Sequence, residues 1–147
     1  MLLNIVIGCG LVVATTVVHA GAMIATLWWL RAAQARRQGL VSAVHKVVHV
    51  AGTAVLMFLA SAVESSLWAA TYLGVGALKN IEEALYFSMV TYTTLGFGDV
   101  TLEGRWRLLS SLEAANGIIM FGWTTALIVA VVQRVYVRHQ ARTIDDG

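Results

Sequence analysis

The sequence predicts an all-α membrane protein with three transmembrane helices and, between the second and third, a short helix and a loop that do not cross. Of the 147 residues, 59% are hydrophobic and only 12% are charged, whereas a soluble domain carries about 25% charged residues. A chain of this size has too much surface to hide that much apolar material from water. The apolar residues also form runs of the length that a helix needs to cross a bilayer, about 20 residues.

The first transmembrane helix is predicted at residues 1–31. Residues 2–30 contain no charged residue. A signal peptide is the alternative, but its apolar part is about 7–15 residues long and follows basic residues, which are absent here. We therefore expect a retained helix. With Cys9 as the single cysteine, an intrachain disulfide and a cysteine-based zinc site are excluded.

The basic residues predict the orientation. They cluster in a connection at residues 32–46 and after the third apolar run, and short basic segments next to membrane helices face the cytoplasm. We expect a multi-pass protein of the plasma (inner) membrane, with its N-terminus outside and its C-terminus in the cytoplasm. The net charge of +2 is too small to suggest nucleic acid as a partner. The basic residues concerned are Arg31, Arg36, Arg37, Lys46, Arg134, Arg138 and Arg142.

The second and third apolar runs predict helices at residues 47–74 and 106–135, each with one acidic residue inside the apolar run. A carboxylate inside a membrane is costly and normally faces the bundle interior or water. Glu64 is expected in polar packing, with a basic or hydroxyl partner on the first helix or in a neighbouring subunit. For Glu113 two interpretations are open: it braces the neighbouring short helix through hydrogen bonds, or it is partly solvated near the outer surface.

Aromatic residues near the ends of the apolar runs are expected at the two membrane interfaces, where tryptophan and tyrosine are enriched. Trp28 and Trp29 would lie at the inner interface, and Trp68, Tyr72 and Trp106 at the outer one.

Residues 82–93 predict a short helix, because the segment begins with two acidic residues, which suit a helix start, and is apolar afterwards. The segment is too short to cross a bilayer. Residues 94–99, Thr-Leu-Gly-Phe-Gly-Asp, follow it. Non-helical backbone at membrane depth is tolerated only where it is buried or lines water. If successive carbonyl oxygens are to point the same way and replace the water shell of an ion, the backbone must alternate between right- and left-handed regions. Gly96 and Gly98 suit the left-handed positions, while the Leu95 and Phe97 side chains would pack against the supporting helix.

These residues resemble the selectivity filter of the potassium-channel family, whose pattern is Thr-Val-Gly-Tyr-Gly. The departures are Leu95 and Phe97, whose side chains would face away from the ion. The resemblance implies that K⁺ is the transported ion and that no organic cofactor is needed. It implies K⁺ coordination by Thr94, Leu95, Gly96 and Phe97, and an outer mouth formed by Gly98 and Asp99.

The resemblance covers residues 47–135 as a pore domain, and leaves the N-terminal helix 1–31, the connection 32–46 and a short cytoplasmic tail at 136–147 outside it. Gly117 corresponds to a gating hinge, although close helix packing is the alternative for this glycine. The implied parts are an outer helix at 47–74, a pore helix at 82–93, a filter at 94–99 and an inner helix at 106–135. The implied site residues are Tyr86, Phe87 and Glu113 for bracing, and Gly117, Ile118, Phe121, Gly122 and Thr125 for the cavity and gating.

The predicted function is passive, selective K⁺ conduction by a homotetramer embedded in membrane lipid, with no nucleic-acid partner and no small-molecule substrate. One chain supplies one filter strand, so a cyclic assembly of copies is needed to enclose a pore. The sequence holds no catalytic constellation, and we expect no enzyme activity. Two alternatives are a weakly selective monovalent cation channel and a non-conducting membrane scaffold. The gating stimulus is not indicated.

Overall fold

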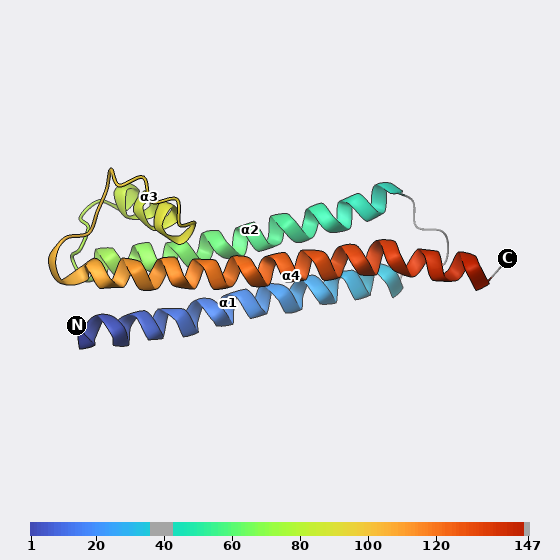
Figure 1. Cartoon of the computed structure of the whole chain (residues 1–147), viewed down its shortest axis with the longest axis horizontal. Coiled ribbons are helices and arrows are strands. Elements are labelled where there is room, and N and C mark those ends of the chain that lie inside the picture. Colours follow the sequence, from blue (N-terminus) through green and yellow to red (C-terminus); the bar gives the residue numbers. More distant parts are fainter. Residues whose placement is uncertain (36–42, 146–147) are drawn as a thin grey trace.

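The computed structural model describes residues 1–35 and 43–145, and in this part of the chain every regular element is a helix. Three long helices run side by side, and a short helix, α3, lies against one end of the bundle (Figure 1). The predicted all-helical class is thus confirmed. In chain order the elements are α1 (Leu2–Ala35), α2 (Ala43–Gly74), α3 (Ile81–Tyr92), the 3₁₀ turn η1 (Gly104–Trp106) and α4 (Arg107–Asp145).

Three of these helices are long and apolar enough to cross a membrane, as predicted. The candidate spans are Leu2–Ala33, Lys46–Gly74 and Gly104–Arg134. The helices extend further than the sequence pattern indicated: α1 and α2 both reach into the connection at 32–46, and α4 continues through most of the tail at 136–147. No proline interrupts these stretches, and the alanine, arginine and glutamine residues in them favour helix.

The end of α2 is set by a glycine-centred cap. Gly76 has a φ of +70°, the left-handed conformation that follows many helices. The amide of Ala77 donates to the Tyr72 carbonyl at 2.8 Å, and the amide of Gly76 donates to the Leu73 carbonyl at 3.0 Å. This is the paired hydrogen-bond pattern of a Schellman motif, and it turns the chain back toward the bundle.

The start of α3 is capped by Asn80, whose side-chain oxygen accepts from the amide of Glu82 at 3.0 Å. Glu82 and Glu83 occupy the first turn, where negative charge is favourable. From this start α3 packs against α2 and α4, and it ends at Tyr92. The helix predicted at 82–93 is therefore present, shifted by one residue.

Two clusters of buried side chains hold the bundle together. One lies where α3 packs onto α2 and α4, and the other lies between α1, α2 and α4 nearer to the opposite end. The first includes Trp68, Tyr72, Phe87, Tyr92, Trp106, Leu109 and Met120, and the second consists of Leu30, Met57, Ala60, Leu127 and Val131.

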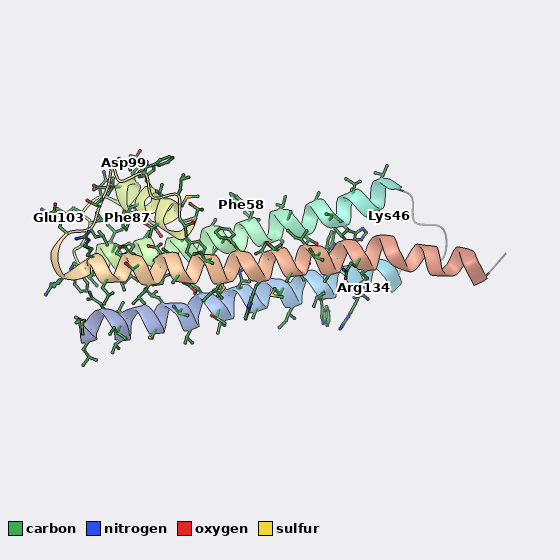
Figure 2. All side chains as sticks on the ribbon, viewed as in Figure 1. Lys46, Phe58, Phe87, Asp99, Glu103 and Arg134 are labelled. Carbon is green, nitrogen blue, oxygen red and sulfur yellow. The ribbon has the colours of Figure 1, made fainter. Side chains whose placement is uncertain are left out.

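The two ends of the bundle carry different residues. Lys46 and Arg134 lie at one end, while Asp99 and Glu103 lie at the other, beside α3 (Figure 2). The N-terminus is at the α3 end and the C-terminus at the opposite end. This arrangement agrees with the predicted relative placement of the termini, but which end faces the cytoplasm stays a prediction. Arg36 and Arg37, which contributed to it, lie outside the described residues.

Candidate functional site

The backbone after α3 has an alternating handedness. Thr94, Gly96 and Gly98 have φ values of +59°, +56° and +81°, so every second residue is left-handed. This is the alternation that a series of carbonyls pointing one way requires, and Gly96 and Gly98 are the glycines at which the sequence analysis expects it. Thr94 is the only non-glycine residue with a positive φ in the part of the chain that the structure describes. A threonine held there costs about 1–3 kcal/mol, and such strain is characteristic of functional sites.

The hydrogen bonds of this segment are directed to one side. The amides of residues 94–96 donate back to the carbonyls of Val90 and Thr91 in the last turns of α3, at 2.9 to 3.3 Å. Within residues 1–35 and 43–145, no hydrogen bond is accepted by a carbonyl of residues 94–97. The amides of residues 94–96 are therefore satisfied by α3, and the carbonyl oxygens of residues 94–97 are available to an external partner.

The side chains of Leu95 and Phe97 are exposed by 57% and 65%. The expectation that they pack against the supporting helix is wrong for the single chain, because more than half of each side chain is exposed. Their burial would require lipid or another protein surface.

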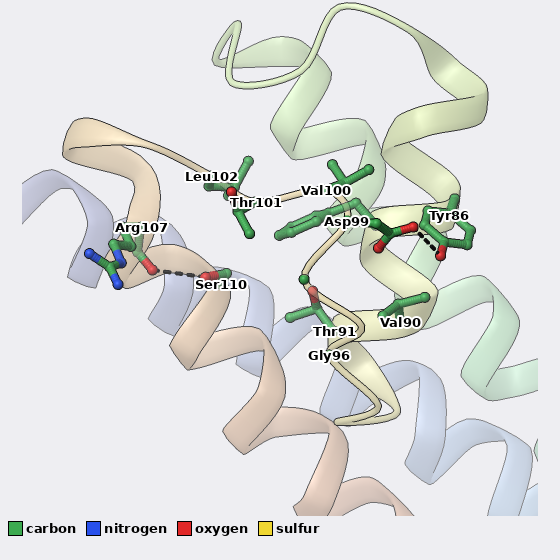
Figure 3. A pocket seen from close by; sticks show the side chains of 12 residues that line it. Tyr86, Val90, Thr91, Gly96, Asp99, Val100, Thr101, Leu102, Arg107 and Ser110 are labelled. Atoms are coloured by element: carbon green, nitrogen blue, oxygen red, sulfur yellow. Dashed lines mark hydrogen bonds between the residues drawn. The ribbon is translucent and has the colours of Figure 1, made fainter.

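The far end of the segment is tied to the middle of α3. The Tyr86 hydroxyl donates to Asp99 Oδ2 at 2.6 Å (Figure 3). This hydrogen bond lowers the pKa of Asp99 and raises the pKa of Tyr86. A cavity of about 220 Å³ lies beside this contact, between α3, the segment and the start of α4. The chain from α3 to Asp99 thus forms a closed loop that is anchored at both ends.

Phe87 lies in the buried cluster and fixes α3 to α2. Its ring meets the Tyr72 ring edge-on, with centroids 5.3 Å apart.

Glu113 on α4 has no exposed surface. Its Oε2 accepts from the Tyr72 hydroxyl at 2.5 Å, and its Oε1 is hydrogen-bonded to the Ser88 hydroxyl of α3. Ser88 Oγ also lies 2.5 Å from the Ser65 carbonyl of α2. Of the two interpretations of Glu113, partial solvation is wrong, and the side chain does contact α3.

Glu64 on α2 is the second fully buried carboxylate. Its Oε1 lies 2.9 Å from His19 Nδ1 on α1, which agrees with the expected partner on the first helix. Its Oε2 accepts from the Tyr92 hydroxyl at the end of α3. Each carboxylate therefore reaches α3 through a hydroxyl group.

Gly117 allows α4 to approach the end of α3. A Cβ atom added at Gly117 would lie 1.9 Å from the Tyr92 carbonyl oxygen, whereas one added at Gly122 would meet nothing within 4 Å. The helix α4 runs unbroken through both positions. Close packing, the alternative interpretation, therefore explains Gly117, and a hinge movement at either glycine stays a prediction.

The remaining predicted cavity residues of α4 are exposed, Ile118 by 62% and Phe121 by 37%, and Thr125 also lies at the surface. They lie on one side of the helix, so they are free to face a cavity in an assembly. Asn116 faces the opposite way and donates to Thr15 Oγ1 of α1 at 2.8 Å.

Tyr72, Ser88 and Tyr92 are supporting residues that the sequence pattern did not predict. Trp68, Tyr72 and Trp106 were expected at the outer interface. All three are buried in the protein and do not face lipid, and their depth in the membrane stays a prediction. The available signal was the pair of carboxylates in apolar runs, since each needs a nearby donor. Among the described residues, no group of three or more histidine, cysteine or acidic side chains could hold a metal ion.

The site defines a membrane protein in which a short helix holds an extended segment, residues 94–99, whose carbonyl oxygens at residues 94–97 are free. The family model described as "Ion channel" matches residues 46–134, which run from the start of α2 to the last part of α4 that has a membrane-span composition. The chain belongs to this ion channel family. It is accordingly an integral membrane protein of ion transport. No curated protein and no solved structure matches the chain.

Replacing Gly117 by Ala should destabilise the protein by about 1–3 kcal/mol, because the new Cβ collides with backbone that cannot move aside. Gly122→Ala is the matched control on the same helix and should be neutral or stabilising by up to about 1 kcal/mol. Thermal unfolding of the purified proteins in detergent compares them. Equal stability of the two variants would contradict the packing role of Gly117.

Replacing Tyr86 by Phe should move the pKa of Asp99 back up toward the ordinary value of 3.8 for an aspartate. In the native protein the hydrogen bond favours the charged carboxylate, so its stabilising effect is present above pH 3.8 and is lost as the pH falls through the lowered pKa. The titration of the Asp99 carboxyl carbon by NMR measures this shift. The control Phe97→Leu keeps the Tyr86 hydroxyl and should leave the titration of Asp99 unchanged. An unchanged titration of Asp99 in Tyr86→Phe would refute the coupling between the two residues.

Proposed function

We propose that the chain is one subunit of a homotetrameric channel that conducts K⁺ passively and selectively. The carbonyl oxygens of residues 94–97, together with the Thr94 hydroxyl, form its filter. The observation that carries the proposal is the alternation of backbone handedness at Thr94, Gly96 and Gly98 within the sequence Thr-Leu-Gly-Phe-Gly.

The chemistry is that of dehydrating a cation. Backbone carbonyls replace the water shell, and several sites in series let one ion displace the next, so that coordination does not stop conduction. The carbonyls of residues 94–97 accept no hydrogen bond from the described residues, which leaves them available for this role. Asp99 lies where the strand returns to the end of the bundle, and its lowered pKa keeps a negative charge at the proposed outer mouth.

The short helix fits a re-entrant pore helix. With 12 residues, α3 is shorter than the roughly 20 residues needed to cross a bilayer. It starts from the same end of the bundle to which the strand returns (Figure 1). The carboxyl end of a helix carries partial negative charge, and in α3 this end lies directly before the strand, where it would favour a cation.

The assembly into four copies is supported by what a single chain leaves open. One strand presents oxygens from one side, and a closed ring of copies supplies the others. Apolar side chains beside the strand and on the adjoining face of α4 are exposed, and a ring would cover them or turn them to the pore. They are Leu95, Phe97, Ile118 and Phe121.

The test is ion flux into liposomes that contain the purified protein. We expect K⁺ flux, with K⁺ preferred over Na⁺ in reversal-potential measurements. Gly96→Ala should lower the flux at least about tenfold, because a side chain at this left-handed position is strained by about 1–2 kcal/mol within the strand itself. Gly76→Ala is the matched control: it places the same strain, at a φ of +70° and with nothing within 4 Å of the new Cβ, in the connection between α2 and α3.

Retained flux in Gly76→Ala together with its loss in Gly96→Ala would support the filter. Equal K⁺ and Na⁺ permeability would favour the weakly selective cation channel. Absence of any flux from well-folded protein would favour the membrane scaffold.

A further inference from the structure

A chain of buried polar groups crosses the helix bundle and ends beside the proposed filter. It starts on α1 with His19, whose Nδ1 is 2.9 Å from Glu64 Oε1 on α2. It continues from Glu64 Oε2 to the Tyr92 hydroxyl, at the last residue of α3. The other ring nitrogen of the histidine, Nε2, lies 3.3 Å from Thr124 Oγ1 on α4. All four helices thus contribute to one connected set of hydrogen bonds.

The three groups that lead to the filter have almost no access to solvent, whereas Thr124 is half-buried. His19 and Glu64 have no exposed surface, and Tyr92 is 1% exposed. A carboxylate in such surroundings is tolerated only with hydrogen-bonding partners. Ionisable residues inside membrane segments are rare and commonly serve function. A feature this costly in a membrane helix calls for a role beyond anchoring α1.

Tyr92 is held at three points. Its hydroxyl is bound by Glu64, its carbonyl oxygen packs against Gly117, and its ring meets the Phe121 ring edge-on with centroids 5.8 Å apart. Thr93 caps the helix immediately afterwards, and the left-handed Thr94 follows. The position of Tyr92 therefore determines where the series of filter carbonyls begins.

We propose that His19 and Glu64 are positioning residues, which act through Tyr92 to fix the first residues of the filter. The helix α1, which lies entirely before the residues matched by the ion channel family, is then a part of the filter support. This inference rests on the proposed function for its effect on selectivity, whereas its effect on the order of the strand does not depend on conduction.

A second polar contact of α1 provides the matched control. Thr15 lies one helical turn before His19 and is equally buried. It accepts from Asn116 of α4 at 2.8 Å, and this contact does not involve α3. Thr15→Val thus removes a buried interhelical hydrogen bond of α1 and leaves the hydrogen bonds that lead from His19 to Tyr92 intact.

The experiment compares His19→Leu, Tyr92→Phe and Thr15→Val in the full chain, reconstituted in lipid. Hydrogen exchange followed by mass spectrometry reports the order of residues 93–99. We expect exchange there to be at least about tenfold faster in His19→Leu and Tyr92→Phe, and unchanged in Thr15→Val. Because His19 and Tyr92 belong to one series of hydrogen bonds, the double variant His19→Leu/Tyr92→Phe should exchange no faster than the faster single variant.

The same proteins report on selectivity. With K⁺ and Na⁺ on opposite sides of the membrane, the reversal potential should show a permeability ratio that falls severalfold in His19→Leu and Tyr92→Phe and stays the same in Thr15→Val. Glu64→Gln should restore most of both properties relative to Glu64→Leu, because an amide can still accept from Tyr92 and bond to His19. Tyr92→Phe, which removes only a hydroxyl, keeps the test valid if His19→Leu fails to fold.

Unchanged exchange at residues 93–99 in both His19→Leu and Tyr92→Phe would overturn the inference, and so would an equal effect of Thr15→Val. If exchange responds as expected but the native protein passes no K⁺, the positioning role stands and the proposed function fails.

Discussion

The structure depends on how two buried carboxylates hold the short helix α3. Glu64 and Glu113 have no exposed surface, and each is hydrogen-bonded to α3, the first through Tyr92 and the second through Ser88. A helix of 12 residues is marginal by itself, so α3 takes its position from these contacts and from the apolar cluster around Phe87. Removing either carboxylate would leave a buried hydroxyl unpaired, at a cost of about 1–3 kcal/mol. The bonds attach near the middle and at the end of α3, so they resist both sliding and rotation of the helix.

The contacts that hold α3 also determine the geometry of the segment that follows it, residues 94–99. Left-handed backbone at Thr94 is unfavourable. It persists because Tyr92, two residues earlier, is held by its hydroxyl group and by its backbone carbonyl. The amides of residues 94–96 bind the end of α3, which leaves the carbonyls on the other side. At the far end the Tyr86–Asp99 hydrogen bond closes the loop. The free carbonyls are thus a consequence of how the amides of residues 94–96 and both ends of the segment are bound.

Much of this could be predicted from the sequence, because the signals were local. The three spans follow from the length of the apolar runs, α3 from its acidic first turn, and the left-handed positions of Gly96 and Gly98 from residue type. The supporting contacts could not be assigned, since their partners lie on different helices: Glu113 signals the need for a donor but not that Tyr72 supplies it. The burial of Trp68 and Tyr72 could not be predicted either, because composition does not reveal that α3 covers this part of α2. The contact between Gly117 and the Tyr92 carbonyl likewise depends on three-dimensional packing.

The central claim is that peptide oxygens of several copies surround a common path for ions. A cryo-electron microscopy map of the protein in lipid nanodiscs with K⁺ in the buffer tests it most directly. The map should show identical subunits around one axis, with the carbonyls of residues 94–97 directed toward that axis and separate ion densities between them. A map in which these residues lie at the outside of the particle, far from any symmetry axis and without ion density, would contradict the claim.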